Sequence, residues 1–507
     1  MEYQKGGTTE MKKSLLLVLS FVMLAAFTLA GCSSSKDSKS SEGTADTGKG
    51  TETQVQQEKK EDPVTLIWYT IGGPQKDQDK VMTEVNKYLV DKINTKIDLK
   101  VIDWGDYSQK MQVIAASGEP FDIAFTSSWA FNYVESARKG YFYELDQLLE
   151  ESGKGIKEEL NPAFLEGSKV NGHNYAIPTN KELPAQAVWR FNKNLVDKYK
   201  LDITKATTLE SLEPMLKTVK ENEPDVYPIP SNIGPFLPFD FALEGIPVGV
   251  ALNSTDLKMV NIWDSPEAKQ VFSTMRKYYQ AGYLPPDVAT KQGNEFEKTG
   301  KWLVDKQHTV PFADVSWSES MQYPIISTPI HEPLVFNWSV TGSMQAISAK
   351  TKHPKQAMEF LNLLNTDKFL RNLVNNGIEG VHYKKLSEGI YEPIPDSGYS
   401  MPAFTLGNMF LLDKLKNDPA DKWEQYKKFN DSAKNAPLLG FQFDPTNVMT
   451  EIANVKNAVD EFGPSLNTGS VDPDKILPKA IEKLKAQGID KIIEEAQKQV
   501  DAWRASK

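Results

Sequence analysis

The sequence has 507 residues, which exceeds what one hydrophobic core of ordinary size accommodates, so we expect two or more domains. Its formal net charge of −10 argues against nucleic acid as a partner and against a basic patch that binds membrane lipids. Cys32 is the single cysteine, so a disulfide within the chain is excluded and packing must supply the stability.

The amino-terminal region has the pattern of a secretory signal that ends at a lipid attachment site. A pair of lysines precedes an apolar run over 14–30, and Leu-Ala-Gly then leads to Cys32. This ending resembles the bacterial lipobox, in which the cysteine is acylated and the chain is cut before it. We therefore expect 1–31 to be a signal peptide, with 1–10 an over-extended start. Cys32 is expected to anchor the protein by lipid to the extracellular face of the cell membrane.

The segment 32–62 follows the predicted cleavage site and is rich in Ser, Lys, Glu, Gln, Thr and Gly. With so few apolar residues it cannot bury a core, so we expect a disordered tether that lifts a folded domain off the membrane. The folded part then begins near residue 63, and no later stretch approaches the roughly eighteen consecutive apolar residues of a membrane span.

The start of the folded part alternates between short β-rich runs and segments with helical periodicity. In chain order we expect strand 64–69, helix 78–94, strand 97–102, helix 107–117 and strand 122–125. This order implies parallel strands joined by right-handed crossovers, and ligands of such sheets bind beyond the carboxyl ends of the strands. Those ends carry turn formers, hydroxyls and aromatic residues, which suits a polar site with stacking surfaces.

Further along, the apolar spacing predicts a helix over 266–281, a strand over 345–348 and a helix over 354–364. The tail is expected to be helical too, with an apolar stripe formed by Ile489, Ile493, Ala496, Val500 and Trp503. We expect this stripe to pack against its own domain rather than against a partner, and we expect Trp68 to lie in the core.

Four local motifs, in their order and spacing, resemble segments of the extracellular solute-binding lipoproteins of ABC importers, family 1, the maltose-binding-like group. They are Gly118–Phe125, Asn171–Pro178, Val188–Leu195 and Ser348–Ala357. The tail over 447–503 resembles the end of one subgroup of large lipoproteins from Gram-positive bacteria. The resemblance implies an α/β, two-lobed fold like that of periplasmic binding proteins, with a hinge of two or more crossings. It also implies a monomer without a cofactor that delivers a carbohydrate, expected to be an oligosaccharide, to ABC transporter permease subunits.

The resemblance also implies a division of the chain into lobes. The first lobe would comprise 63–181 plus 342–403, and the second 182–341 plus 404–507. The crossings between them are expected near Lys181–Pro184 and near Asn337–Thr341. A ligand that binds both lobes would shift an equilibrium between open and closed forms toward the closed one.

Carbohydrate recognition needs flat apolar faces against the C–H groups of a sugar and polar side chains for its hydroxyls. The aromatic candidates are Trp129, Trp189, Trp317 and Trp338. The polar candidates are Ser128, Asp122, Thr179, Arg190, Asn192 and Asp314. The alternative for the tryptophans is burial in the core. Arg190 suits vicinal hydroxyls or a carboxylate, and its alternative is an ion pair with a structural aspartate.

Catalysis has little support in the sequence. The five histidines form no metal-binding spacing, and neither a Gly-x-Ser-x-Gly elbow nor a phosphate-binding loop is present. The sequence does not exclude a pair of catalytic carboxylates for glycoside hydrolysis, because two residues far apart in the chain can form such a pair in the folded protein. We therefore expect a non-enzymatic binding protein without a metal site. A surface-anchored glycan-degrading enzyme, either a lyase or a hydrolase, and a structural surface lipoprotein are the alternatives.

Overall fold

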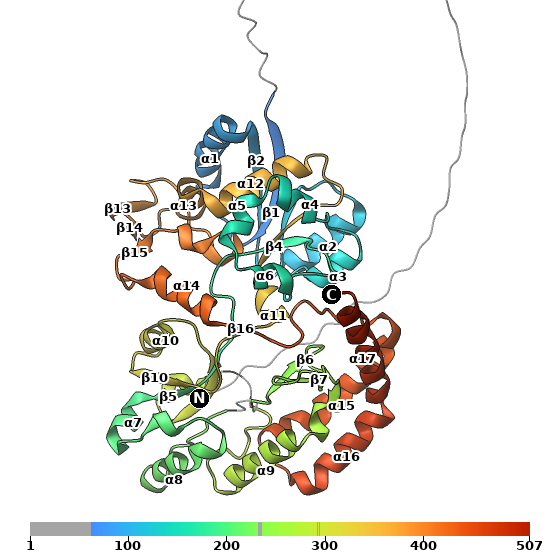
Figure 1. Cartoon of the computed structure of the whole chain (residues 1–507). Helices are drawn as coiled ribbons and strands as arrows, with labels where there is room; N and C mark the ends of the chain where they lie inside the picture. Colours follow the sequence, from blue (N-terminus) through green and yellow to red (C-terminus); the bar gives the residue numbers. More distant parts are fainter. Residues whose placement is uncertain (1–61, 232–235, 292, 294) are drawn as a thin grey trace, which may run out of the picture. The chain divides into compact units, whose positions relative to one another are not determined.

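The computed structural model describes residues 62–507, except 232–235, 292 and 294 (Figure 1). The predicted signal peptide, Cys32 and nearly all of the predicted tether lie outside the described residues. Within the described part, no helix combines the length and the apolar character that a membrane span requires.

A five-stranded sheet with the strand order β2-β1-β3-β12-β4 forms the centre of the first group of elements. Its strands are β1 (Val64–Ile71), β2 (Thr95–Ile102), β3 (Ile123–Thr126), β4 (Ala176–Pro178) and β12 (Met344–Ile347). β1 pairs in parallel with both β2 and β3, which confirms the predicted arrangement. β12 comes from a distant part of the sequence and pairs antiparallel with β3 and β4, so two stretches of chain build this sheet.

Helices pack on this sheet because their apolar residues fall on one face. α1 buries Val81, Val85 and Leu89, as their spacing predicts. Trp68 of β1 is fully buried, as expected, and its ring centroid lies 5.3 Å from that of Phe360 on α12. The helices of this group are α1 (Gln78–Ile93), α2 (Tyr107–Ser117), α3 (Tyr133–Arg138), α4 (Asp146–Glu151), α5 (Lys154–Glu159), α6 (Pro162–Gly167), α12 (Pro354–Thr366) and α13 (Lys368–Asn376).

A second group of elements contains two small antiparallel sheets, with the strand orders β10-β5-β9 and β6-β7-β8. Their strands are β5 (Ala187–Asn192), β6 (Phe239–Phe241), β7 (Val248–Ala251), β8 (Val260–Asn261), β9 (Val304–His308) and β10 (Ile325–Pro329). The helices beside them are α7 (Lys193–Tyr199), α8 (Glu213–Asn222), α9 (Pro266–Gln280) and α10 (Ala313–Met321). α9 confirms the helix predicted over 266–281.

The tail forms three helices, α15 (Met449–Asn467), α16 (Pro473–Ala486) and α17 (Ile489–Ala505). Ile489, Ala496 and Val500 of the predicted stripe are buried, in the same apolar cluster as Phe272 of α9. The other two residues of the stripe are partly buried against that cluster. The tail therefore packs on the second group of elements, which confirms the prediction that the stripe faces its own domain.

Three segments of the described chain, called the crossings below, run between the five-stranded sheet and the second group of elements. They are 179–186, 330–343 and 433–441. The first two exchange backbone hydrogen bonds of 2.8 and 2.9 Å between Ala185 and Leu334. The second and third pair through β11 (Leu334–Val335) and β16 (Lys434–Asn435), and the second also carries α11 (Asn337–Val340). We call the elements of the five-stranded sheet the first lobe, and the second group with the tail the second lobe.

Residues 404–432 pack with the first lobe, whereas the sequence assigned them to the second. β15 (Lys414–Leu415) pairs with β14 (Ile390–Pro393), which is the partner of β13 (Tyr383–Ser387). The amide of Asn372 on α13 donates to the carbonyl of Leu411 at 2.9 Å, and α14 (Lys422–Ser432) follows. The difference arises because a two-residue strand carries too little periodicity to reveal its partner in the sequence.

Candidate functional site

Three aromatic rings lie in a row beyond the carboxyl ends of the parallel strands. Trp104 follows β2 and Trp129 follows β3, and their ring centroids are 6.3 Å apart at an interplanar angle of 20°. Phe404 continues the stack, 6.0 Å from Trp104. Trp104 is 43% exposed and Trp129 is 52% exposed, so large parts of both indoles are open to solvent. We call Trp104, Trp129 and Phe404 the aromatic row.

Hydrogen bonds tie Trp129 to the second crossing. Its indole N–H donates to the carbonyl of Gly342 at 2.7 Å. The backbone N–H of Ser128, an exposed residue and a predicted site residue, donates to the carbonyl of Thr341 at 2.8 Å. The position of the aromatic row therefore depends on the backbone of the segment that links the lobes.

Trp338 lies on α11 in that same crossing. It is 49% exposed and stacks on Phe336 with 5.4 Å between ring centroids and an interplanar angle of 21°. His308, at the end of β9, contacts it edge-on at 5.5 Å. The structure thus leaves two of the four predicted tryptophans, Trp129 and Trp338, well exposed, and both are connected to one crossing.

The other two predicted tryptophans lie deeper. Trp189 on β5 is only 1% exposed and belongs to an apolar cluster of the second lobe, so the structure favours the core alternative for it. Trp317 on α10 is partly buried, and its ring covers the guanidinium of Arg190 at 5.2 Å. One part of the Trp317 ring remains accessible, but its packing on Arg190 already gives it a structural role.

Arg190 forms the ion pair that was its structural alternative. Its Nε and Nη2 donate to the two carboxylate oxygens of Asp305 at 2.9 and 2.7 Å, and Nη2 also contacts Glu297 at 2.6 Å. Burial lowers the pKa of Arg190, but the hydrogen bonds and charges of Asp305 and Glu297 outweigh this and raise it above the usual value. With the side chain only 3% exposed, the guanidinium is occupied within the protein.

Two polar candidates fix the backbone of the first lobe. Asp122 precedes β3, at the edge opposite the aromatic row, and accepts a hydrogen bond from the backbone N–H of Ile67 at 2.8 Å and another from the hydroxyl of Thr351. Thr179 is 1% exposed, and its hydroxyl donates to the carbonyl of Leu406 at 3.1 Å. These contacts within the protein account for the positions of both side chains without a ligand.

Asn192 and Asp314 have comparable roles in the second lobe. Asn192 caps α7 by accepting from the N–H of Asn194 at 3.2 Å, and its amide donates to the carbonyl of Gly300 at 2.9 Å. Asp314 accepts from the backbone N–H and the hydroxyl of Ser327 at 3.0 and 2.6 Å. Both side chains are therefore engaged by groups of the protein itself, whereas Ser128 is exposed.

The sequence-based site omitted two members of the aromatic row. Trp104 had a usable signal, since it directly follows a predicted strand of the parallel sheet. Phe404 had no such signal in the sequence, because it comes close to Trp104 only when residues 404–432 fold against the first lobe.

Two histidines lie beside the first and second crossings. His331 accepts at Nε2 from the backbone N–H of Ala187 at 3.0 Å, and its Nδ1 contacts the carbonyl of Glu332. His308 pairs with Ala187 in the β5–β9 register. Burial lowers the pKa of both imidazoles, and the positive charge of Lys306 lowers both further.

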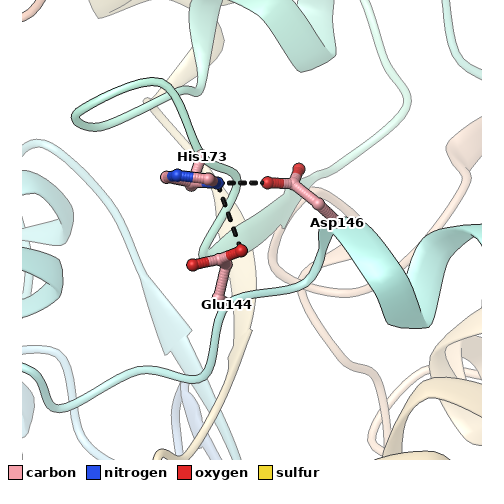
Figure 2. A group of neighbouring side chains, drawn as sticks. All are labelled: Glu144, Asp146 and His173. Atoms are coloured by element: carbon pink, nitrogen blue, oxygen red, sulfur yellow. Dashed lines mark hydrogen bonds and ion pairs between the residues drawn. The ribbon is translucent and has the colours of Figure 1, made fainter.

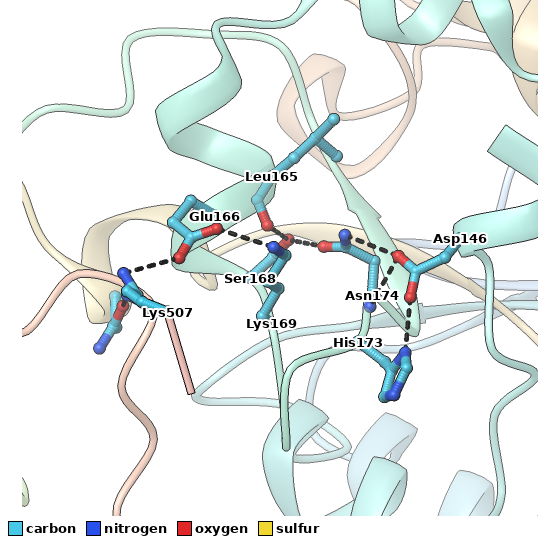
Figure 3. Close-up of polar contacts among 10 residues, drawn as sticks. Asp146, Leu165, Glu166, Ser168, Lys169, His173, Asn174 and Lys507 are labelled. Carbon is cyan, nitrogen blue, oxygen red and sulfur yellow. Dashed lines mark hydrogen bonds and ion pairs between the residues drawn. The ribbon is translucent and has the colours of Figure 1, made fainter. Parts of the chain in front are cut away.

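Glu144, Asp146 and His173 form a separate polar cluster on the first lobe (Figure 2). Nδ1 of His173 lies 2.8 Å from Asp146 and 3.1 Å from Glu144. The buried amide of Asn174 holds the other oxygen of Asp146 at 3.1 Å and in turn accepts from the hydroxyl of Ser168 (Figure 3). Side chains of this type could ligate a cation, but Glu144 and His173 are exposed, Asp146 is partly exposed, and their mutual contacts account for the geometry.

Two family models match the chain. The model described as "Bacterial extracellular solute-binding protein" matches residues 75–369, and a "Domain of unknown function (DUF3502)" matches residues 437–505. Among curated proteins, a "Carbohydrate ABC transporter substrate-binding protein" of Streptococcus pneumoniae is 35% identical over 459 residues, which cover 88% of this chain and 92% of the relative. "Lipoprotein LipO" of Bacillus subtilis is 23% identical over 406 residues, 75% of each chain.

Solved structures give the same relationship. The N-glycan transport solute binding protein NgtS of Streptococcus pneumoniae aligns with a TM-score of 0.77 at 34% identity, covering 87% of this chain and 98% of that one. The structure of NgtS in complex with Man5GlcNAc aligns with a TM-score of 0.63 at 34% identity, covering 88% and 99%. These similarities extend over both lobes and the tail, so the two-lobed α/β fold is confirmed.

Proposed function

The chain belongs to the bacterial extracellular solute-binding proteins, and we propose that it captures an oligosaccharide between its two lobes and delivers it to an ABC-type importer. The relatives named for carbohydrate transport and for N-glycan transport support this choice of ligand class. The proposed partners are the permease subunits of the importer, and the proposed working form is a monomer without catalytic activity.

The observation that carries the proposal is the exposed aromatic surface at the crossings. Trp129 and Trp338 present indole surface to solvent at 52% and 49% exposure, and each is stacked on another aromatic ring, so the exposed surface is shared rather than isolated. An aromatic face binds the C–H face of a pyranose, while hydroxyls at its rim find backbone carbonyls and Ser128. Stacking of Trp104 against Trp129 holds the pair in a fixed orientation before a ligand arrives.

The connection to the crossings supplies the mechanism. Closure rotates the backbone of the second crossing, which carries Trp338 and accepts hydrogen bonds at Thr341 and Gly342 from the segment of Trp129. A sugar that stacks on both tryptophans makes more contacts in the closed form than in the open one. That difference in contacts is what drives closure, because a ligand shifts a conformational equilibrium only by its differential affinity.

We also propose a revised division of the chain. The first lobe would comprise 63–181 plus 342–432, and the second 182–341 plus 433–507. Pairing of β15 with β14 supports the later end of the first lobe, and the third crossing at 433–441 adds a strand to the hinge. Three crossings that pair with one another restrict the relative motion of the lobes to rotation about an axis near the crossings. Two crossings would restrict this motion less.

The membrane anchor is a proposal from the sequence. We propose that Cys32 carries the lipid, and that 32–62 is the tether between the membrane and the first lobe. The relative named as a lipoprotein supports this. The binding site would then face the cell exterior, within reach of a permease in the same membrane.

A thermal-shift screen of the purified chain from residue 33 onward tests the proposed ligand class. A panel of neutral and acidic oligosaccharides should contain a member that raises the melting temperature, because a ligand at ~100 times its dissociation constant adds about 2.7 kcal/mol of stability. Chromatography of the same mixtures checks for turnover. Release of smaller sugars would favour the glycan-degrading alternative, and a panel without any shift would contradict the carbohydrate assignment.

A further inference from the structure

The hinge region holds two imidazoles, and one of them, His308, contacts Trp338 of the proposed binding site. His331 lies in the second crossing, directly after β10, and His308 ends β9. Ala187, the first residue of β5, lies between them: it pairs with His308 across the strands and donates its N–H to His331. The two histidines thus flank the point where the first crossing enters the second lobe.

The hydrogen bonds of His331 fix its protonation state. Nε2 accepts from the backbone N–H of Ala187 at 3.0 Å, so this nitrogen carries no proton, and Nδ1–H donates to the carbonyl of Glu332. The crossing is held further by the amide of Gln186, which donates to the carbonyl of His331 at 2.9 Å. A proton added to Nε2 would place two donors face to face, and the backbone bond to Ala187 would be lost.

His308 transmits its charge state to the proposed binding surface. Its ring lies edge-on against Trp338 at 5.5 Å between centroids, and Trp338 in turn stacks on Phe336. A neutral imidazole edge contributes an ordinary aromatic contact, whereas an imidazolium is attracted to the electron-rich face of the indole and is repelled by the positive charge of Lys306. The orientation of Trp338 therefore depends on whether His308 is charged.

Burial is the main cause that opposes protonation of both rings. Lys306, two residues before His308 on the same strand face, lowers both pKa values further, and the charge of His331 also lowers the pKa of His308. Glu332 is the carboxylate that favours protonated His331, but Lys434 on β16 pairs with it at 2.7 Å. The pKa of each ring therefore lies below the usual histidine value, so both rings are neutral at neutral pH and gain charge on acidification.

We propose that His308 and His331 make ligand capture pH-dependent: acidification protonates them, detaches Ala187 from the second crossing, and draws the indole of Trp338 toward His308 and away from the ligand, so that the ligand is released. This inference rests on the proposed oligosaccharide binding and adds its regulation. The result is a protein that holds its ligand at neutral pH and loses affinity in an acidified surrounding, by roughly tenfold for one lost hydrogen bond of ordinary strength.

Calorimetry with the tightest oligosaccharide from the panel tests the proposal. Between pH 7.5 and 5.0 the wild type should lose about tenfold in affinity. The double variant His308→Gln with His331→Gln should bind with a flat profile, because glutamine offers Ala187 an acceptor that does not titrate. His353→Gln, before α12 of the first lobe, is the matched control and should keep the wild-type profile. Denaturant midpoints at each pH verify that every variant is folded.

Other results of these measurements would contradict the proposed pH dependence. A flat wild-type profile, or a steep profile that survives in the double variant, would overturn the pH device while leaving oligosaccharide binding intact. A separate measurement on the ligand-free protein follows the amide signal of Ala187 by NMR through the titration of His331. If that signal does not shift with the imidazole, the proposed link is wrong. If it shifts and no oligosaccharide binds at any pH, the hydrogen bond titrates as described, and the ligand assignment fails instead.

Discussion

At the scale of single residues, the tryptophans separate into surface and core by their positions on the strands. Trp129 comes after the end of a strand and is half exposed, whereas Trp189 lies within β5 and is 1% exposed. Both are tryptophans beside polar residues in the sequence, so composition alone does not distinguish them. The distinction depends on whether the tryptophan lies within a strand that is buried on both faces, as β5 is, and that is settled by tertiary packing.

Trp129→Ala should weaken oligosaccharide binding by on the order of 2 kcal/mol, because an aromatic anchor at the centre of a site is lost. The free energy of unfolding should fall by only about 1 kcal/mol, since an exposed ring and one hydrogen bond to Gly342 are removed. Calorimetry and denaturant melts measure the two effects.

Trp189→Ala is the matched comparison. It should cost about 3–5 kcal/mol of stability, as large deletions in a core do, with little direct effect on affinity in the folded fraction. Unchanged affinity in the Trp129 variant, with a large loss of stability, would show that the aromatic row is structural and that the binding site lies elsewhere.

Asp240 on β6 offers a pH test that is independent of the histidines. The carboxylate is 5% exposed and accepts from the backbone N–H of Leu438 in the third crossing at 2.8 Å. Burial raises the pKa of Asp240 to about 7, although the Leu438 hydrogen bond opposes this. Because the pKa is raised on folding, its contribution to stability is complete below about pH 4 and is lost as the pH rises through 7.

Asp240→Asn should therefore stabilise the protein at pH 8 by on the order of 2 kcal/mol more than it does at pH 5, since the amide keeps an acceptor and carries no charge. Urea unfolding of both proteins at the two pH values measures the difference. An equal effect of the substitution at pH 5 and pH 8 would contradict the raised pKa.

The candidate polar residues show that the type of a side chain does not predict its hydrogen-bond partner. Asp122, Asn192 and Asp314 were chosen because their side chains suit sugar hydroxyls, and the structure engages each of them with nearby backbone or hydroxyl groups. Short polar side chains at strand and helix ends bind the local backbone more often than a ligand. A motif fixes where such a residue lies along a strand, but not which of its possible partners it meets.

At the scale of elements, the prediction is correct where an apolar pattern extends over many residues, and it fails where a strand has only two residues. The parallel strands β1 to β3, the helix α9 and the apolar stripe of α17 agree with the sequence. The two-residue strands β11, β15 and β16 gave no signal in the sequence, yet β11 pairs with β16 in the crossings and β15 pairs with β14. Their existence depends on pairing with distant partners, which local sequence does not encode.

The turn between α15 and α16 should be sensitive to a single methyl group. Gly469 has a φ of +67°, and a Cβ there would lie 2.2 Å from the backbone of Met275 on α9. Gly469→Ala should hence destabilise the protein by at least about 2 kcal/mol, from left-handed backbone strain together with displacement of the tail from α9. Thermal unfolding measures the loss.

Gly73→Ala is the control for that substitution, because no atom lies within 4 Å of its added methyl group. Its melting temperature should stay close to that of the wild type. If both variants melt alike, the tail is not held against α9 as tightly as the structure shows.

At the scale of the whole molecule, the proposed lipid anchor would determine where the binding site operates. Cys32→Ala in the expressing bacterium should move the protein from the membrane fraction to the medium, since the lipid attachment is lost. Fractionation followed by immunoblotting measures the distribution. A Ser33→Ala chain is the control and should stay with the membrane, and a Cys32 variant that also stays there would contradict lipid anchoring at this residue.

Capture by two lobes requires that the ligand change the dimensions of the molecule, and this is the broadest expectation of the proposed function. The three crossings pair with one another, so the lobes should rotate as rigid bodies about them rather than deform internally. Small-angle scattering of the chain from residue 63 onward should show a smaller radius of gyration when the oligosaccharide is bound. The Trp129→Ala variant should need a higher ligand concentration for the same contraction, because its ligand makes fewer contacts that distinguish the closed form. Saturated binding without contraction would mean that the sugar occupies one lobe alone, and the exposed tryptophans at the crossings would then have to be explained by a different partner.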